Sequence, residues 1–160
     1  MASPSLPRSL KPSFLDRLID VSTDDSRSAA WYDLDGIVAA VKRDLDNLLN
    51  TRQSHQGACD GFEEVQRSLI TYGLPDAASM AVDTPQQRLQ LARRIEAIIA
   101  QFEPRLRQVH VRIVDAPDNL RRVLQFQILG RLQIEPAVDL QLDASMELTT
   151  GQLTLTTAKT

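Results

Sequence analysis

The sequence has only one cysteine and two histidines, the side chains that metal and redox sites use most, and only 4% of its residues are aromatic. With Cys59 alone, no disulfide can form within the chain, and we expect a reducing compartment. His55 and Cys59 supply half of a zinc site at best, so no metal site is predicted. Because aromatics are scarce, Leu, Ile and Val must build most of the core.

Signals of catalysis and of cofactor binding are also missing. The six glycines stand singly, so no glycine-rich loop could hold a phosphate. No Gly-x-Ser-x-Gly nucleophile elbow occurs in the sequence. We therefore predict that the protein is not an enzyme and takes no cofactor.

No apolar stretch approaches the roughly 18 residues that a membrane span needs, and residues 1–7 lack the apolar run of a signal peptide. We expect a cytoplasmic protein without direct membrane insertion. The formal net charge of −3 offsets the local clusters of arginine, so no nucleic-acid partner is predicted.

The length of 160 residues fits one domain with an arm. Residues 1–30 are predicted to be a flexible N-terminal arm with a short apolar helix, and residues 31–160 a single α+β domain. The apolar residues of that short helix are Phe14, Leu15, Leu18 and Ile19. They could pack on their own domain or bind a partner, and both interpretations remain open.

Apolar residues at helical spacing predict a helix over residues 34–50 and a shorter one over residues 61–71. The third helix begins with Thr84-Pro85-Gln86-Gln87, which combines an N-cap, a first-turn proline and a capping-box glutamine. Pro104 disfavours helical angles at Glu103, so this helix should end near Phe102.

After Pro104 the apolar period changes from helical to alternating. Strands are predicted around Val109–Ile113, Leu124–Ile134, Val138–Leu142, Met146–Thr149 and Gln152–Thr157, with a bulge or bend at Gly130. The predicted fold class is α+β, with N-terminal helices packed on a small, mostly antiparallel or mixed sheet from the C-terminal half.

The junction between the third helix and the first strand carries the most chemistry. Glu103 lies between apolar Phe102 and Leu106, so it could act as the acid of a peptidoglycan hydrolase. Such chemistry usually needs a second facing carboxylate, and no spacing marks one. In the alternative, Arg105 pairs with Glu103 or points at a partner.

The last predicted strand is the other candidate contact. A small open sheet leaves unpaired backbone groups at its edges, and these can accept an added strand. The strand carrying Leu153 and Leu155 could be such an edge or an ordinary protected one.

Several segments, taken in order, resemble the TssE family of type VI secretion baseplate subunits, which is related to the small wedge protein of contractile phage tails. They are Phe14–Leu18, Arg43–Leu45, Leu48–Arg52, Tyr72–Asp76, Phe102–Leu106 and the pattern Leu124-x-Phe126-x-Ile128-x-Gly130-x-Leu132.

The resemblance implies a structural component of a bacterial contractile injection machine. Such a subunit joins the wedge subunits TssF, TssG and TssK and initiates the contractile sheath of TssB and TssC, with its baseplate docked at the inner face of the cell envelope. The family's Glu-Pro-Arg motif falls on Glu103, Pro104 and Arg105, which we expect to bind the wedge. Together with the residues from the short helix and the last strand, the expected partner-binding set is Glu103, Pro104, Arg105, Phe14, Leu15, Leu18, Leu153 and Leu155.

Overall fold

A computed structural model describes residues 34–53, 61–75, 82–114 and 123–157. Its helical elements are α3 (Leu34–Asn50), α4 (Glu63–Gln66), the 3₁₀ turn η1 (Leu69–Thr71) and α5 (Pro85–Phe102). Its strands are β1 (Leu106–Val114), β2 (Val123–Leu132), β3 (Val138–Glu147) and β4 (Leu153–Thr157). The predicted α+β class is confirmed, with helices in the first half and a four-stranded antiparallel sheet in the second.

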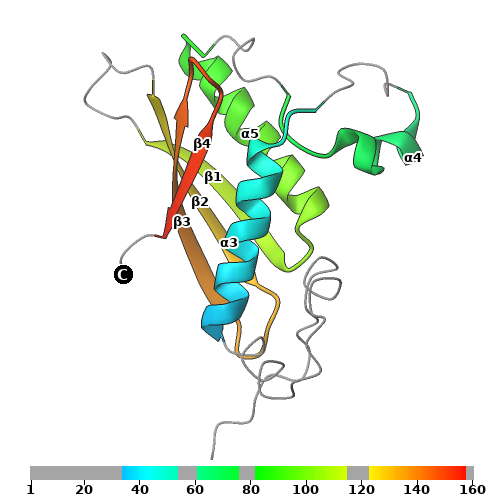
Figure 1. The fold of residues 1–160 in the computed structure, drawn as a ribbon, viewed down its shortest axis with the longest axis vertical. Helices are drawn as coiled ribbons and strands as arrows, with labels where there is room; N and C mark the ends of the chain where they lie inside the picture. Colours follow the sequence, from blue (N-terminus) through cyan, green and yellow to red (C-terminus); the bar gives the residue numbers. More distant parts are fainter. Residues whose placement is uncertain (1–33, 54–60, 76–81, 115–122, 158–160) are drawn as a thin grey trace, which may run out of the picture.

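The strands follow one another in the order β1-β2-β3-β4, so β1 and β4 form the two edges (Figure 1). Alternate residues of the strands face opposite sides, which separates an apolar face from a polar face. In β2, for example, Phe126 and Ile128 are buried while Gln125 and Arg131 are exposed.

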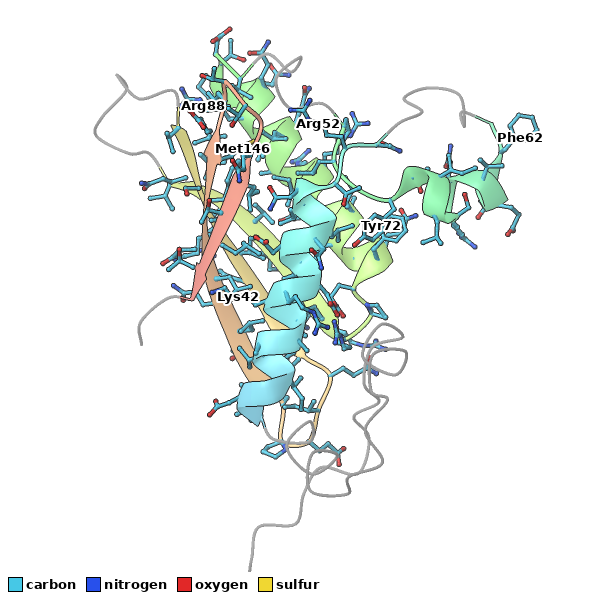
Figure 2. The ribbon with its side chains drawn as sticks, in the orientation of Figure 1. Lys42, Arg52, Phe62, Tyr72, Arg88 and Met146 are labelled. Atoms are coloured by element: carbon cyan, nitrogen blue, oxygen red, sulfur yellow. The ribbon has the colours of Figure 1, made fainter. Side chains whose placement is uncertain are left out.

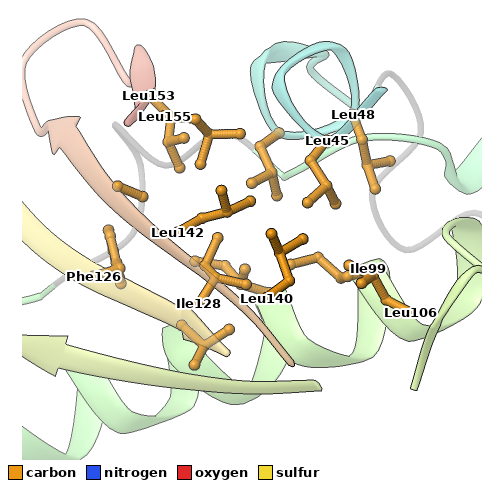
Figure 3. Packing of buried hydrophobic residues seen from close by; sticks show 14 of the residues in the cluster. Leu45, Leu48, Ile99, Leu106, Phe126, Ile128, Leu140, Leu142, Leu153 and Leu155 are labelled. Atoms are coloured by element: carbon orange, nitrogen blue, oxygen red, sulfur yellow. The ribbon is translucent and has the colours of Figure 1, made fainter. Parts of the chain in front are cut away.

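Helices α3 and α5 cover the apolar face and close the core. Figure 3 shows Leu45 and Leu48 of α3 facing the strand residues Phe126, Ile128 and Leu142 across this layer. Aliphatic side chains fill nearly all of it, as the scarcity of aromatics predicts. Leu45, Ile99 and Leu142 have no exposed surface at all.

Of the three helices predicted after residue 30, two are confirmed; the short apolar helix of the arm lies outside the described residues. Helix α3 has the predicted bounds, and α5 begins with the predicted capping box: Gln87 N–H donates to the Thr84 hydroxyl at 3.2 Å and Thr84 N–H donates to the Gln87 side chain at 3.0 Å. The α5 helix also ends at Phe102, directly before the residue that Pro104 restricts.

The predicted helix over residues 61–71 is wrong in length. It is split into α4 and η1, because Ser68 adopts an extended conformation and its hydroxyl accepts a hydrogen bond from Ile70 N–H. Two of its apolar residues are exposed rather than buried, with Phe62 at 66% and Leu69 at 81%.

The strand predictions need two corrections. The segments around Val138–Leu142 and Met146 form one continuous strand, β3, which pairs with β4 through the turn at Thr150-Gly151. The predicted irregularity at Gly130 is found on the neighbouring strand: Gly130 itself pairs in register with Leu140 of β3, and the residues opposite it in β1 form the bulge. The irregularity lies in β1, between Arg107 and His110, where Gln108 adopts a positive φ of 53°.

Candidate functional site

The junction between α5 and β1 is a corner held by backbone hydrogen bonds. Glu103 N–H donates to the Ile99 carbonyl at 2.8 Å and closes the helix, and Leu106 N–H donates to the Glu103 carbonyl at 3.1 Å across the turn. Gln133 N–H then donates to the Arg105 carbonyl at 2.9 Å, which ties the corner to the segment after β2. These three hydrogen bonds together fix the direction of the chain at Pro104.

The carboxylate of Glu103 is buried at this corner, with 4% of the residue exposed. Arg105 donates from Nε to Glu103 Oε1 at 2.6 Å and from Nη2 to Glu103 Oε2. The fork of the guanidinium therefore meets both carboxylate oxygens, the strongest geometry for such a pair. Of the two alternatives left open by the sequence, the internal pair is the one observed.

A third charged group completes the site, and sequence reasoning missed it. Arg105 Nη2 also donates to Asp44 Oδ2 at 2.6 Å, although Asp44 lies on α3, 61 residues away. Arg43 binds the other oxygen of Asp44 at 2.9 Å. Ion pairs link these two arginines and two carboxylates, so their charges cancel. We call the four residues the corner network: Arg43, Asp44, Glu103 and Arg105.

The spacing of α3 contains the signal that could have marked Asp44. It stands three residues after Val41 and four before Leu48, both buried, so a carboxylate lies beside the apolar face of the helix. A carboxylate in that position needs a cation, because burying an unpaired charge is costly. Nothing in the sequence indicates which cation meets it.

Electrostatics at the corner network favour the charged form of Arg105. Burial alone lowers the pKa of this guanidinium, but the hydrogen bonds and charges of Glu103 and Asp44 outweigh it and raise the pKa above its ordinary value. Tyr72, which meets Phe102 edge to face at 5.2 Å, lies in the same field. Burial, followed by the charges of Asp44 and Glu103, raises the pKa of its phenol.

Part of the corner network still reaches the surface. The side chain of Arg105 is 19% exposed and Pro104 is exposed. The hydrogen bonds of Arg105 use Nε and Nη2, and no residue in the described ranges bonds to Nη1. A partner could therefore reach this nitrogen without breaking the pair inside.

The remaining predicted contact residues fall in two places. Leu153 and Leu155 point into the core, 2% and 6% exposed, so only their backbone groups are available at the β4 edge. Phe14, Leu15 and Leu18 lie outside the described residues, as do His55 and Cys59 of the dismissed metal site.

Three consecutive residues at and after the end of α3 bond to distant segments: two of them to β4 and its turn, and one to the segment at Leu74. The side-chain amide of Asn50 bonds to Leu153, Arg52 Nη2 donates to the Thr150 carbonyl at 2.7 Å, and the Thr51 carbonyl accepts from Leu74 N–H at 2.8 Å. Figure 2 shows Arg52 beyond the end of α3. This cluster joins three segments that are distant in sequence.

Of the helices in the described part of the chain, none has both the length and the apolar character required to cross a bilayer. Within the same ranges, His, Cys, Asp and Glu side chains form no group of three that could hold a metal ion.

These features define a small α+β domain in which a partly buried charge network fixes the corner between helix and sheet. The family model for baseplate wedge protein gp25 matches residues 36–137, more than half of the chain, and the chain belongs to this family. The predicted kinship with baseplate wedge proteins is thereby confirmed, and the chain is a structural baseplate component.

Among solved structures, one similar chain comes from "The baseplate complex from the type VI secretion system". It is 20% identical, with a TM-score of 0.49, and the similarity covers 69% of this chain and 94% of that one. No curated protein matches the sequence.

Proposed function

We propose that the protein is a baseplate component of a type VI secretion system that joins the wedge subunits TssF, TssG and TssK. In this role it stands on the cytoplasmic side of the envelope and initiates assembly of the TssB and TssC sheath. The observation that carries the proposal is the family match across residues 36–137, which includes the whole corner network.

The corner network supports a docking role as well as a structural one. Glu103 and Asp44 hold Arg105 in one orientation, so little conformational entropy is lost when a partner binds it. Its Nη1 can donate two further hydrogen bonds, which suits a carbonyl or carboxylate on a wedge subunit. Pro104, exposed beside it, offers a rigid apolar contact.

The same geometry argues against the hydrolase alternative. Both carboxylate oxygens of Glu103 accept hydrogen bonds from Arg105, and the side chain is 5% exposed. A general acid must reach the leaving oxygen of its substrate. Glu103 is instead turned toward its own chain, so the structural role is the better supported of the two.

The test is co-purification of the wedge subunits with the wild-type protein and with Arg105→Lys. Lysine keeps the positive charge next to Glu103 and Asp44 but lacks the planar fork, so we expect a folded protein that recovers much less TssF and TssG. Undiminished recovery with a native melting curve would contradict the proposed docking role of Arg105.

Arg105→Ala is less informative, because it would leave the buried carboxylate of Glu103 unpaired. Breaking a buried pair in this way costs about 3–5 kcal/mol of folding stability. The matched control is Arg107→Lys. Arg107 is exposed on β1, two residues after Arg105, so the same substitution there should leave recovery of the wedge subunits unchanged.

The β4 edge supports the second part of the proposal. On one side β4 pairs with β3, and on the other it ends the sheet (Figure 1). A sheath subunit could add an extended segment there by backbone hydrogen bonds, the usual way in which an open sheet recruits a strand.

A further inference from the structure

The hydrogen bonds of β4 alternate between its two sides. Glu147 N–H donates to the Gln152 carbonyl at 2.9 Å, so Gln152 faces β3 at the start of the ladder. In an antiparallel pair, every second residue turns its N–H and C=O away from the partner strand. The outward residues of β4 are therefore Leu153, Leu155 and Thr157.

The first of these outward positions is already occupied. Leu153 N–H donates to Asn50 Oδ1 at 2.9 Å, and Asn50 Nδ2 donates to the Leu153 carbonyl at 2.9 Å. One side-chain amide thus forms the two hydrogen bonds that a neighbouring strand would form. We call this pair of bonds the Asn50 clip.

The clip is itself held in place. Asn50 Nδ2 also donates to the Asp46 carbonyl at 3.0 Å, one turn back in α3. Next to it, Arg52 bonds to the Thr150 carbonyl and fixes the turn that leads into β4. The helix therefore holds the Asn50 amide in the orientation that bonds to Leu153.

The opposite edge of the sheet carries a similar cap. Val111 N–H of β1 donates to the Glu96 side chain of α5 at 2.7 Å. Each edge strand is thus covered at one point by a polar side chain from a helix. Such coverage is a known means of limiting unwanted pairing at sheet edges.

We infer that Asn50 is a specificity-determining residue that closes the β4 edge at Leu153, so that an added strand begins its pairing at Leu155. The inference rests on the proposed function, in which a sheath subunit supplies that strand. The incoming segment bonds to Leu155 and Thr157 and stops at the clip. Asn50 thereby sets the register of the contact.

The clip also favours a sheath strand over a second copy of this chain. With Leu153 closed, the outward groups on β4 are those of Leu155 and Thr157 alone. Two copies pairing edge to edge would share only this short stretch, and short edges resist self-association. A strand held nearby by an assembly gains effective concentration and can use so short a site.

Amide hydrogen exchange on the full chain, measured by NMR, tests the inference. The variants are Asn50→Ala and the control Asn47→Ala, which removes an exposed asparagine one turn earlier on α3. In the protein alone we expect Leu153 to exchange at least about fivefold faster in Asn50→Ala, the factor that corresponds to one hydrogen bond of ordinary net strength. Asn47→Ala should match the wild type.

Addition of purified TssB–TssC sheath subunits gives the second readout. In the wild type, Leu155 and Thr157 should become protected while Leu153 stays as it was. In Asn50→Ala, Leu153 should become protected as well, because the ladder can now extend by one position. Should Asn50→Ala fail to fold, Asn50→Gln moves the same amide by one methylene and is expected to open the same position.

The outcomes separate the two claims. Added protection of Leu153 in the wild type, at the same level as Leu155, would overturn the inference and leave sheath binding intact. No protection of Leu155 or Thr157 in any variant would overturn strand addition at this edge, and the inference with it. Unchanged exchange of Leu153 in unbound Asn50→Ala and Asn50→Gln would show that the clip does not hold that position.

Discussion

At the scale of single residues, Gly73 shows how one missing side chain lets two segments meet. Its φ is +102°, and a Cβ placed there would lie 2.4 Å from the Thr51 carbonyl oxygen. That oxygen accepts the hydrogen bond from Leu74 N–H. Only glycine allows this close approach, because any Cβ would push the two bonded segments apart.

We therefore expect Gly73→Ala to lower the free energy of unfolding by at least about 3 kcal/mol, because the steric overlap adds to the left-handed strain. Urea denaturation measures this change in the free energy of unfolding. Gly61→Ala is the matched control, because Gly61 has a similar φ of +97° but open space around its Cβ position. It should cost only the left-handed strain, about 1–2 kcal/mol, and equal losses in the two variants would contradict the steric argument.

The corner network shows how far single residues can be predicted. Glu103 and Arg105 are two residues apart, so the sequence already raised the possibility of a pair between them. Asp44 comes from another helix, 61 residues away, and only the packing of α3 beside the corner brings it to Arg105. Local spacing cannot encode a contact of that kind.

At the scale of elements, the strongest local signals were also the most reliable. The capping box and Pro104 delimit α5 within a single stretch of chain, and both act through nearby backbone atoms. The segment that contains α4 and η1 differs, since its apolar residues fit a helical face but do not meet the core. The apolar periodicity of that segment predicted a buried helical face, but in the tertiary structure these side chains stay exposed.

A substitution in η1 tests that contrast. Leu69 is 81% exposed, so we expect Leu69→Ser to change the free energy of unfolding by no more than about 0.5 kcal/mol. Leu48 of α3 is 2% exposed, and Leu48→Ala should cost about 2–5 kcal/mol. Thermal melting of the two variants gives the comparison, and a large loss in Leu69→Ser would place Leu69 in an interface that stabilises the fold.

At the scale of the whole molecule, β4 has two roles, and a simple truncation cannot test one without affecting the other. Its leucines fill the core, whereas its outer backbone groups form the proposed sheath contact. Truncation after Gly151 would remove both at once, so a loss of sheath assembly could follow from unfolding alone. A change confined to the outward backbone separates the two tasks.

Thr157→Pro is such a change, because proline removes an N–H that faces away from β3. We expect normal stability but a severalfold loss of sheath initiation, measured as sheath polymer formed on purified baseplates. Proline is tolerated at sheet edges for this same reason, since no ladder bond is lost. Thr157→Ala keeps the N–H and should polymerise normally; equal polymerisation by both variants would exclude this donor from the contact.

The sequence by itself determined the α+β class, the bounds of α3 and α5 and the sharp corner at Pro104, since these depend on periodicity, capping and backbone restriction within short segments. Tertiary structure alone decided that Asp44 joins Arg105, that Gly73 passes Thr51 and that Asn50 bonds to Leu153 at the edge of β4. Each of those contacts joins residues that are far apart in the sequence. The reason is physical: burial of the apolar faces sets the positions of the elements, and the polar contacts follow from those positions.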